Sequence, residues 1–336
     1  MVRVLVTGGA GFIGSNFVRY ALAAHGDWQV TTLDKLTYAG RLENLESVEG
    51  DPRHRFVRGD VADPAVAGPL VRESDLVVHF AAETHVDRSI RHAGDFITTD
   101  VYGTFVLLEA ARENPALRRF VQISTDEVYG SVPTGSSKET DELRPRNPYS
   151  ASKAGADRLA YSYWATYDVP VIITRASNNY GPNQFPEKII PLFITNLIDD
   201  IPVPLYGDGQ NERDWLHVED HCRGIDLLIE QGVSGEVYNI GGGNQVKNVD
   251  LTHRILELAG KPASLIKPVA DRQGHDRRYS LDTGKLESLG WKPQVPFEEG
   301  LAQTVRWYRD NERWWRPIKN DDPAFRKYYQ EQYGNR

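Results

Sequence analysis

The sequence predicts an α/β protein: a doubly wound parallel sheet with a smaller mixed α/β lobe that caps it. Three observations support this fold class. Short apolar segments alternate with helical patterns over the first half of the 336-residue chain. Segments such as Leu76-Val-Val-His-Phe80 are apolar at nearly every position, as expected of parallel strands that are buried on both faces. A glycine-rich turn follows the first apolar segment and precedes the first helical pattern.

The elements follow one another in order along the chain. The apolar run at 2–7 predicts the first strand, and the helical pattern at 12–24 predicts the first helix. Further strands are expected at 28–34, 55–60, 75–81, 119–125 and 169–176, and further helices at 98–112 and 149–167. This alternation implies right-handed crossovers between parallel neighbours.

Beyond Ser177 the alternation breaks. Connections rich in Pro and Gly, such as Asn179-Tyr-Gly-Pro182, separate shorter helices and one further strand at 237–240. Ligands bind at the carboxyl edge of the sheet in open α/β folds, so we expect this part of the chain to lie over that edge. We therefore divide the chain into residues 1–176, a Rossmann-like lobe, and residues 177–336, mainly a capping lobe from which some segments return to the first.

Composition excludes several classes of protein. The net charge of −8 argues against nucleic-acid binding, which needs a surplus of Lys and Arg on one face. No apolar stretch approaches the ~18–20 residues that cross a bilayer, and no leader pattern precedes the first strand, so we expect a cytoplasmic protein without membrane contact. The single cysteine, Cys222, excludes an internal disulfide and is expected to pack in a helix interface.

The first turn has the features of a dinucleotide site. Its glycines are spaced Gly8-x-x-Gly11-x-x-Gly14 between a strand and a helix, so the backbone can approach a pyrophosphate at the helix start. Asp34 ends the second strand, where a carboxylate accepts hydrogen bonds from ribose hydroxyls and repels a 2′-phosphate. We therefore predict NAD rather than NADP, although Lys35, which follows directly, would favour a 2′-phosphate.

A candidate catalytic pair begins the helix at 149–167. Tyr149 and Lys153 are four residues apart and therefore lie on one helix face. Tyrosine titrates near ~10, so its use as a base at neutral pH requires a nearby cation such as Lys153. A lysine at this place can also hold the nicotinamide ribose.

With these motifs the chain resembles the extended short-chain dehydrogenase/reductase superfamily. A closer resemblance, to the nucleotide-sugar 4,6-dehydratases, extends from Val2 to about Tyr333. It is carried by Thr7-Gly-Gly-Ala-Gly-Phe-Ile-Gly14, Phe80-Ala-Ala-Glu-Thr-His-Val-Asp-Arg-Ser-Ile90, Ser124-Thr-Asp-Glu-Val-Tyr-Gly130, Tyr149-Ser-Ala-Ser-Lys153, Arg175-Ala-Ser-Asn-Asn-Tyr-Gly-Pro182, Pro186-Glu-Lys188 and Asp271-Arg-Gln-Gly-His-Asp276. The first and fourth motifs are common to the superfamily, and Thr125-Asp126-Glu127 is the discriminating one.

The resemblance implies a hydro-lyase reaction: oxidation of a hexose at C4, loss of water across C5 and C6, and return of the hydride to C6. Two carboxyl groups in opposite protonation states suit the elimination, because one removes the C5 proton while the other protonates the C6 hydroxyl. The resemblance gives Asp126 as the acid at C6, Glu127 as the base at C5, Tyr149 as the base at O4 and Thr125 as a partner of O4. Like charge and burial would keep one of the two acids protonated.

The resemblance also implies the rest of the site. The residues expected to bind NAD are Gly8, Gly11, Phe12, Ile13, Gly14, Asp34, Lys35, Leu36, Thr37, Asp60, Val61, Phe80, Ala81, Ala82, Thr99, Tyr149, Lys153 and Asn179. The residues expected to bind the nucleotide sugar are Thr84, Thr125, Asn178, Lys188, Pro204, Tyr206, Arg213, Asn248, Arg272 and His275. The cations of this second set suit a pyrophosphate. No metal is expected, because His217 and His221 lack a third ligand in a supporting motif.

Two helices, roughly 96–112 and 151–167, resemble the pair that superfamily members pack into a four-helix dimer interface. A homodimer is therefore expected. The aromatic residues of the tail, among them Trp314, Trp315 and Tyr333, are expected to dock on the chain's own domain, because aromatic side chains bury well with a polar edge exposed.

Other activities remain open. A nucleotide-sugar 4-epimerase would share the Tyr149 chemistry but has no work for two carboxyl groups. A UDP-glucuronate decarboxylase carries Ser at the position of Asp126, and a non-catalytic NAD-sensing regulator would commonly lose the Tyr, the Lys or the acids. We expect dTDP-glucose as substrate, but UDP-, CDP- and GDP-linked hexoses stay open because thymine differs from uracil by one methyl group. Nor does the sequence distinguish rhamnose synthesis from other deoxysugar pathways.

Overall fold

The computed structural model describes residues 1–334, so the last two residues of the expected capping lobe, 335–336, lie outside the described part. The centre of the fold is a seven-stranded sheet in the order β10-β6-β5-β4-β1-β2-β3, and all neighbouring strands are parallel. Its strands are β1 (Val2–Thr7), β2 (Trp28–Asp34), β3 (His54–Arg58), β4 (Leu76–His79), β5 (Arg119–Thr125), β6 (Val171–Ala176) and β10 (Val237–Ile240). The expected doubly wound sheet is confirmed.

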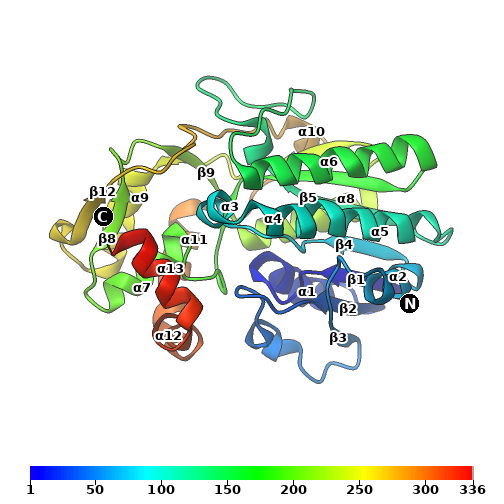
Figure 1. Ribbon diagram of the computed structural model, residues 1–336, viewed down its shortest axis with the longest axis horizontal. Helices are drawn as coiled ribbons and strands as arrows, with labels where there is room; N and C mark the ends of the chain where they lie inside the picture. Colours follow the sequence, from blue (N-terminus) through cyan, green and yellow to red (C-terminus); the bar gives the residue numbers. More distant parts are fainter. Residues whose placement is uncertain (335–336) are drawn as a thin grey trace.

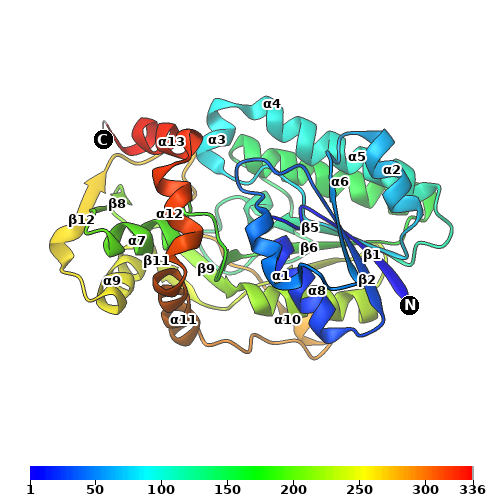
Figure 2. The ribbon, with the colours of Figure 1, turned by 90° about the horizontal axis from the view of Figure 1, so that it is seen from below.

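Helices cover both faces of the sheet, as Figure 2 shows. One layer consists of α2 (Pro64–Arg72), α4 (Ala93–Phe96), a π-helical turn η2 (Ile97–Tyr102), α5 (Gly103–Arg112) and α6 (Pro148–Tyr167). The other consists of α1 (Phe12–Ala24), α8 (Val218–Gln231) and α10 (Gly284–Glu287). Short helices in the connections are η1 (Leu42–Val48), α3 (Val86–Arg91), η3 (Asp126–Tyr129) and η4 (Ala263–Leu265).

A smaller lobe lies beyond the carboxyl ends of the strands (Figure 1). Its two small sheets have the orders β11-β9-β7 and β12-β8. The lobe contains β7 (Asn178–Tyr180), β8 (Val203–Tyr206), β9 (Glu212–His217), β11 (Gln245–Lys247), β12 (Ile266–Val269), α7 (Ile189–Ile198), α9 (Asn248–Ala259), α11 (Phe297–Asp310), α12 (Glu312–Asn320) and α13 (Pro323–Tyr333). Two later segments, β10 and α8, return to the first lobe, and the division at residue 176 stays a prediction.

Several predicted boundaries differ from the observed ones. β4 ends at His79, so Phe80 and Ala81 lie in the loop after the strand rather than within it. β3 covers 54–58 instead of 55–60. β6 begins at Val171 instead of 169 because Pro170 has no N–H to contribute to the strand ladder. The helix expected at 98–112 begins earlier and passes through the π-helical turn η2, which the sequence analysis did not predict.

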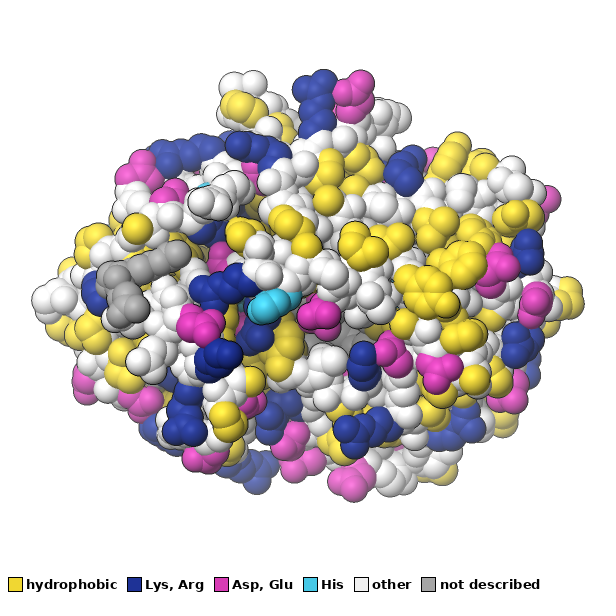
Figure 3. Space-filling model, in the orientation of Figure 1, with side chains coloured by type: hydrophobic (Ala, Val, Ile, Leu, Met, Phe, Trp, Pro, Cys, Tyr) yellow, Lys and Arg dark blue, Asp and Glu magenta, His cyan; other side chains and the backbone are white. Residues whose placement is uncertain are grey.

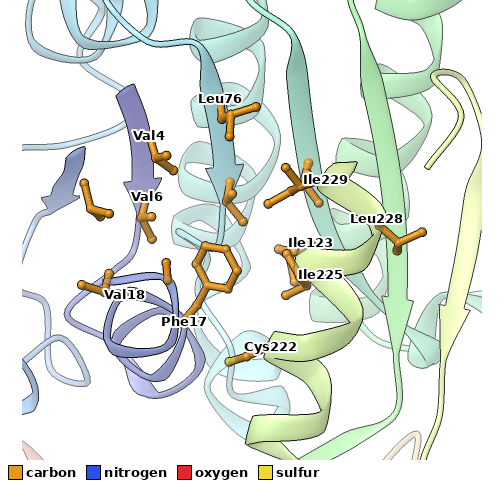
Figure 4. Close-up of a cluster of buried hydrophobic side chains, with 14 of the residues drawn as sticks. Val4, Val6, Phe17, Val18, Leu76, Ile123, Cys222, Ile225, Leu228 and Ile229 are labelled. Carbon is orange, nitrogen blue, oxygen red and sulfur yellow. The ribbon is translucent and has the colours of Figure 1, made fainter. Parts of the chain in front are cut away.

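The core is divided by the sheet. Figure 4 shows α1 and α8 packed on β1, β4 and β5, with Phe17 of α1 and Ile225 of α8 among the buried side chains. Cys222 lies in this cluster, which confirms its expected role in helix packing. The aromatic tail also docks on its own chain, since Trp314, Trp315 and Tyr333 are buried in the core of the smaller lobe. Within residues 1–334, no helix is long and apolar enough to cross a membrane.

Candidate active site

Two connected cavities lie between the carboxyl edge of the sheet and the smaller lobe. The first, of about 280 Å³, follows the loops after β1, β2, β4 and β5. The second, of about 150 Å³, continues into the smaller lobe. The residues that line both are Thr84, Glu127, Asn178, Glu187 and Lys188. A ligand in the first cavity therefore meets a ligand in the second beside Glu127.

The glycine turn after β1 shapes the first cavity. Gly8 has a φ of +68°, and a Cβ atom there would lie 2.6 Å from the amide nitrogen of Ala81. A Cβ atom on Gly14 would collide with the carbonyl oxygen of Gly8. Gly11 begins α1 without a side-chain cap, so the first amides of the helix stay free for an anion. This turn fits the pyrophosphate of a dinucleotide, because any side chain would fill the space.

Asp34 lies at the end of β2 beside the same turn. Its two carboxylate oxygens accept hydrogen bonds from the amides of Ala10 (2.9 Å) and Leu36 (2.8 Å), and desolvation raises its pKa. Lys35, which left NADP open, forms an ion pair with Asp60 at 2.5 Å. The Lys35 ammonium group beside Asp34 is thus paired with the Asp60 carboxylate, which competes with a 2′-phosphate for it, and this arrangement favours NAD.

Almost the whole expected cofactor set lines the first cavity; Leu36 does not. Its amide holds Asp34, and its side chain packs against the apolar cluster of Figure 4. The expected members on the cavity wall are Gly8, Gly11, Phe12, Ile13, Gly14, Asp34, Lys35, Thr37, Asp60, Val61, Phe80, Ala81, Ala82, Thr99, Tyr149, Lys153 and Asn179.

The turn after β5 brings two carboxyl groups to the junction of the cavities. Thr125 caps η3 by accepting a hydrogen bond from the amide of Glu127 (3.3 Å) and donates one to Asp126 (3.2 Å). Asp126 is only 2% exposed and lines neither cavity, whereas Glu127 is half-buried and lines both. Burial raises the pKa of Asp126 well above its usual range, and the carboxyl groups of Glu127 and Asp214 raise it further. Of the two neighbouring acids, Asp126 is therefore the one whose surroundings favour the protonated form.

Buried polar contacts hold this turn in place. The Tyr129 hydroxyl accepts a hydrogen bond from Arg175 (2.7 Å) and donates one to Asn239 of β10 (2.9 Å). Arg175 in turn forms a buried, two-pronged ion pair with Asp157 of α6, at 2.8 and 3.0 Å. The turn that carries the acids and the helix that carries Tyr149 are thus joined through the guanidinium group of Arg175.

α6 positions Tyr149 and Lys153. Asn147 and Ser150 cap its start reciprocally, with the Ser150 amide donating to Asn147 (2.9 Å) and the Asn147 amide donating to Ser150 (3.2 Å). Lys153 is buried and donates to the Ile123 carbonyl at 2.5 Å, and desolvation lowers its pKa.

The pKa of Tyr149 does not fall in this environment, although the sequence analysis expected Lys153 to lower it. Desolvation raises the pKa of Tyr149 well above its usual range. The negative charges of Glu127, Asp100 and Asp126 raise it as well, whereas a hydrogen bond with Thr125 lowers it. The burial of Tyr149 and the carboxyl groups around it therefore outweigh the effect that was expected of Lys153.

The second cavity gathers the expected substrate residues apart from Thr125, which lines only the first. Its cations are held in place by neighbours: Lys188 donates to the Thr84 carbonyl (2.6 Å) and Arg213 to the Asp276 carbonyl (2.9 Å). The expected residues on its wall are Thr84, Asn178, Lys188, Pro204, Tyr206, Arg213, Asn248, Arg272 and His275. Burial and the guanidinium groups of Arg272 and Arg213 lower the pKa of His275 to about 4, so its imidazole is neutral near pH 7.

Several lining residues were not assigned from the sequence. Glu187 is buried at the junction, with one oxygen bound by Arg88 at 2.9 and 3.0 Å and the other unpartnered. It stands in the quoted Pro186-Glu-Lys188 motif, which was the available signal. His221 lines the first cavity, bonded to Asn179 at 2.9 Å, with an unpartnered Nε2 atom. Its spacing of four residues from His217 can suit a zinc pair, but within residues 1–334 no three His, Cys, Asp or Glu side chains are grouped so that they could hold a metal ion.

Comparison with known proteins gives consistent matches. Residues 5–304 match the family model described as GDP-mannose 4,6 dehydratase. A dTDP-glucose 4,6-dehydratase from Actinoplanes sp. is 54% identical over 322 residues, which cover 94% of this chain and all of that protein. One from Streptomyces antibioticus is 55% identical over 324 residues, covering 95% and 96% of the two chains.

Solved structures agree. The dTDP-glucose 4,6-dehydratase DesIV from Streptomyces venezuelae, with NAD and dTDP bound, is 55% identical and aligns with a TM-score of 0.92 over 94% of this chain and all of that chain. A UDP-glucose 4-epimerase from Thermus thermophilus, in complex with NAD, is 33% identical with a TM-score of 0.85 over 92% and 99%. The chain is thus similar to both classes and shares more identical residues with the dehydratase.

Proposed function

We propose that this chain, which belongs to the GDP-mannose 4,6-dehydratase family, converts dTDP-glucose to dTDP-4-keto-6-deoxyglucose and water. It is an NAD-dependent hydro-lyase. The observation that carries this proposal is the turn after β5, where a buried acid, Asp126, adjoins a carboxylate, Glu127, that reaches both cavities. A 4-epimerase reaction contains no elimination step that would need two adjacent carboxyl groups.

The first step is oxidation at C4. NAD, when bound in the first cavity, supplies the oxidant for C4 and later returns the same hydrogen to C6. In its phenolate form, which the positive charge of a bound nicotinamide ring would favour, Tyr149 takes the proton of the O4 hydroxyl, and Thr125 holds that oxygen by a hydrogen bond. Lys153, one turn further along α6, holds the nicotinamide ribose.

The second step is the elimination. The C4 ketone acidifies the C5 proton, which Glu127 removes and returns to C5 when the hydride reaches C6. For this step the Asp126 carboxyl has to turn from its buried position beside Thr125 towards the junction, where it gives its proton to the C6 hydroxyl, which leaves as water. The raised pKa of Asp126 supports its role as acid, since a carboxyl that is ionised at pH 7 has no proton to donate.

The second cavity holds the nucleoside diphosphate in this proposal. Arg213, Arg272 and Lys188 face it with positive charge, and guanidinium groups bind phosphate oxygens in pairs. Pro204 and Tyr206 also line this cavity, together with Leu192 and Phe193, and they offer apolar surface on which a base can stack. The diphosphate thus lies in the smaller lobe, and the hexose reaches the junction at Glu127.

A turnover assay tests the proposal. The purified protein is supplied in turn with dTDP-, UDP-, CDP- and GDP-glucose, and each product is analysed by mass spectrometry. We expect dTDP-glucose to lose one water fastest, without net reduction of NAD. Stoichiometric accumulation of reduced NAD, a product that keeps its C6 hydroxyl, or faster turnover of another nucleotide sugar would contradict it.

A homodimer in the cytoplasm is also part of the proposal. Figure 3 shows hydrophobic side chains gathered over α5 and α6, the helix pair that the sequence analysis selected. The large apolar side chains exposed on η2, α5 and α6 are Ile97, Tyr102, Phe105, Tyr161 and Tyr167. Contiguous apolar patches of this kind mark protein interfaces, and a two-fold axis across two helices creates a four-helix contact.

A further inference from the structure

One buried carboxyl group near the cavities has no part in the mechanism above. Asp100 lies on the π-helical turn η2, which interrupts the layer between α4 and α5 and carries Thr99 of the first cavity. Its side chain is 2% exposed. π-helical turns inside helices are rare and occur frequently at functional sites.

Asp100 joins two segments of the site. One carboxylate oxygen accepts a hydrogen bond from the amide of Glu83, in the loop that lines the first cavity (2.8 Å). The other accepts one from the hydroxyl of Ser152 on α6 (2.6 Å). Ser152 stands between Tyr149 and Lys153 in the sequence, so Asp100 bonds directly to the catalytic turn of α6.

The Ser152 hydroxyl has two acceptors within reach. Besides Asp100, its oxygen lies 2.8 Å from the carbonyl oxygen of Tyr149. When Asp100 is ionised, the single hydroxyl proton of Ser152 points to the carboxylate. When Asp100 is protonated, it donates to Ser152, and the hydroxyl turns to the Tyr149 carbonyl. The protonation of Asp100 therefore changes a hydrogen bond on Tyr149's own backbone.

Charged groups of several elements surround the Asp100 carboxyl group. Lys153 of α6 and Glu83 of the loop after β4 are the charged side chains that act on Asp100. Desolvation raises the pKa of Asp100 to about 7, which places its titration near neutrality. Asp100 in turn raises the pKa of Lys153, and together with Glu127 and Asp126 of η3 it raises that of Tyr149.

We propose that Asp100 is a positioning residue that holds the first turn of α6 against the cofactor cavity and whose charge sets the pH range in which Tyr149 accepts its proton. This inference rests on the proposed function for Tyr149. An ionised Asp100 opposes a second negative charge on Tyr149, whereas a protonated Asp100 does not. The carboxyl group thus makes the oxidation step less responsive to rising pH.

Asp100→Asn tests the charge separately from the contacts. The amide oxygen still accepts from the Glu83 amide, and the amide nitrogen donates to Ser152, as protonated Asp100 would. We expect the pH–rate profiles for kcat of the variant and wild type to coincide at low pH. Above neutrality, the pH at which kcat rises to half of its maximum should be about one unit lower for the variant than for wild type, because removal of a negative charge lowers the pKa of neighbouring groups. Coincident profiles over the whole range would overturn the proposal.

A second measurement needs no substrate. The folded protein binds the Asp100 proton more tightly than the unfolded chain, where Asp titrates near ~3.9. Wild type should therefore lose stability as the pH rises from about 4 towards about 7, whereas the variant should not show this loss. We expect the Tm of Asp100→Asn minus that of wild type to grow by several degrees between about pH 5 and about pH 8. A constant difference would mean that the charge of Asp100 does not titrate there.

Two further variants act as controls. Thr104→Val removes a hydrogen bond to the backbone carbonyl of Asp100 while the shape and the carboxyl charge stay the same, so its Tm should fall equally at every pH. Ser152→Ala removes a donor to the carboxylate and should move the pH of stability loss upwards, which tests the proposal should Asp100→Asn fail to fold. Failure of wild type to turn over dTDP-glucose would refute the proposed function, while the Tm measurements would still decide whether Asp100 titrates.

Discussion

At the scale of single residues, burial assigns the two acids of the β5 turn. Asp126 and Glu127 are neighbours, but only Asp126 is almost fully enclosed and near a third carboxyl group, Asp214. Desolvation penalises the charged form of a carboxyl, and nearby negative charge adds to that penalty. The difference in surroundings therefore separates the roles of two chemically similar side chains.

The first prediction separates elimination from oxidation. Asp126→Asn keeps the shape of the acid but cannot protonate the leaving hydroxyl. We expect C4 oxidation to survive and water loss to slow by roughly 10²- to 10⁴-fold, the usual range for general acid catalysis. Reduced NAD should then accumulate, which the absorbance in a single turnover would reveal. Tyr149→Phe is the control, because it lacks the base for oxidation and should give no such signal; the reverse pattern would show that the two roles are wrongly assigned.

The second prediction concerns cofactor choice. Asp34→Ala removes the carboxylate that we expect to bind the adenosine ribose, and with it the repulsion of a 2′-phosphate. We expect NAD affinity to fall by about tenfold to a hundredfold, as for the loss of one or two hydrogen bonds, and the preference over NADP to narrow. Titration of each cofactor by intrinsic fluorescence measures both effects. Wild-type affinity for NADP that equals or exceeds its affinity for NAD would contradict the assignment.

At the scale of elements, the strand–turn–helix unit of β1 and α1 depends on backbone that only glycine can adopt. Gly8 has a left-handed conformation and lies against the loop after β4, so two neighbouring strands meet there without intervening side chains. The close approach brings the amides of α1 towards the cavity. The element is therefore suited to bind an anion through its backbone, whatever its other side chains are.

The third prediction compares two glycines on either side of α1. Gly8→Ala should weaken NAD binding by about tenfold or more, since left-handed backbone alone costs a residue with a Cβ atom roughly 1–2 kcal/mol. Gly26→Ala is the matched control, because nothing lies within 4 Å of its Cβ position and its φ is not positive. It should leave binding unchanged. Equal effects of the two substitutions would show that conformation at Gly8 is not what matters.

At the scale of the whole molecule, the site is assembled from both lobes. The turn after β5 supplies the acids and α6 supplies Tyr149, while the smaller lobe supplies Arg213 and Arg272. The outer surface of η2, α5 and α6 carries the exposed apolar side chains of the proposed dimer. Because α6 has one face towards the site and another towards that surface, association and catalysis share an element.

The fourth prediction tests this surface. Phe105→Glu places a charge in the apolar patch, and burying an unpaired charge in an interface is unfavourable. We expect the variant to be monomeric by light scattering coupled to size-exclusion chromatography, with wild type as a dimer. Val233→Glu is the control, since Val233 is 59% exposed on the loop after α8, outside α5 and α6. A monomeric wild type, or equal masses for both variants, would contradict the dimer.

The sequence by itself determined the parts of this protein whose structure depends on neighbours in the chain. β1, α1, β2 and β5 have the predicted bounds, because a continuous apolar run, a glycine turn and a helical repeat are local properties. The position of Thr125, Asp126 and Glu127 at a strand end follows from the same local pattern, so the sequence alone is enough to locate this turn.

Only the tertiary structure decided the remainder. β10 joins the sheet beside β6, about sixty residues earlier in the chain, and Glu187 and His221 reach the cavities from the later part of the chain. The protonation of Asp126 depends on Asp214 of β9, and the environment of Asp100 on a π-helical turn packed against Ser152. These features arise from contacts between distant segments and from the exclusion of water, and no local pattern of residues encodes either one.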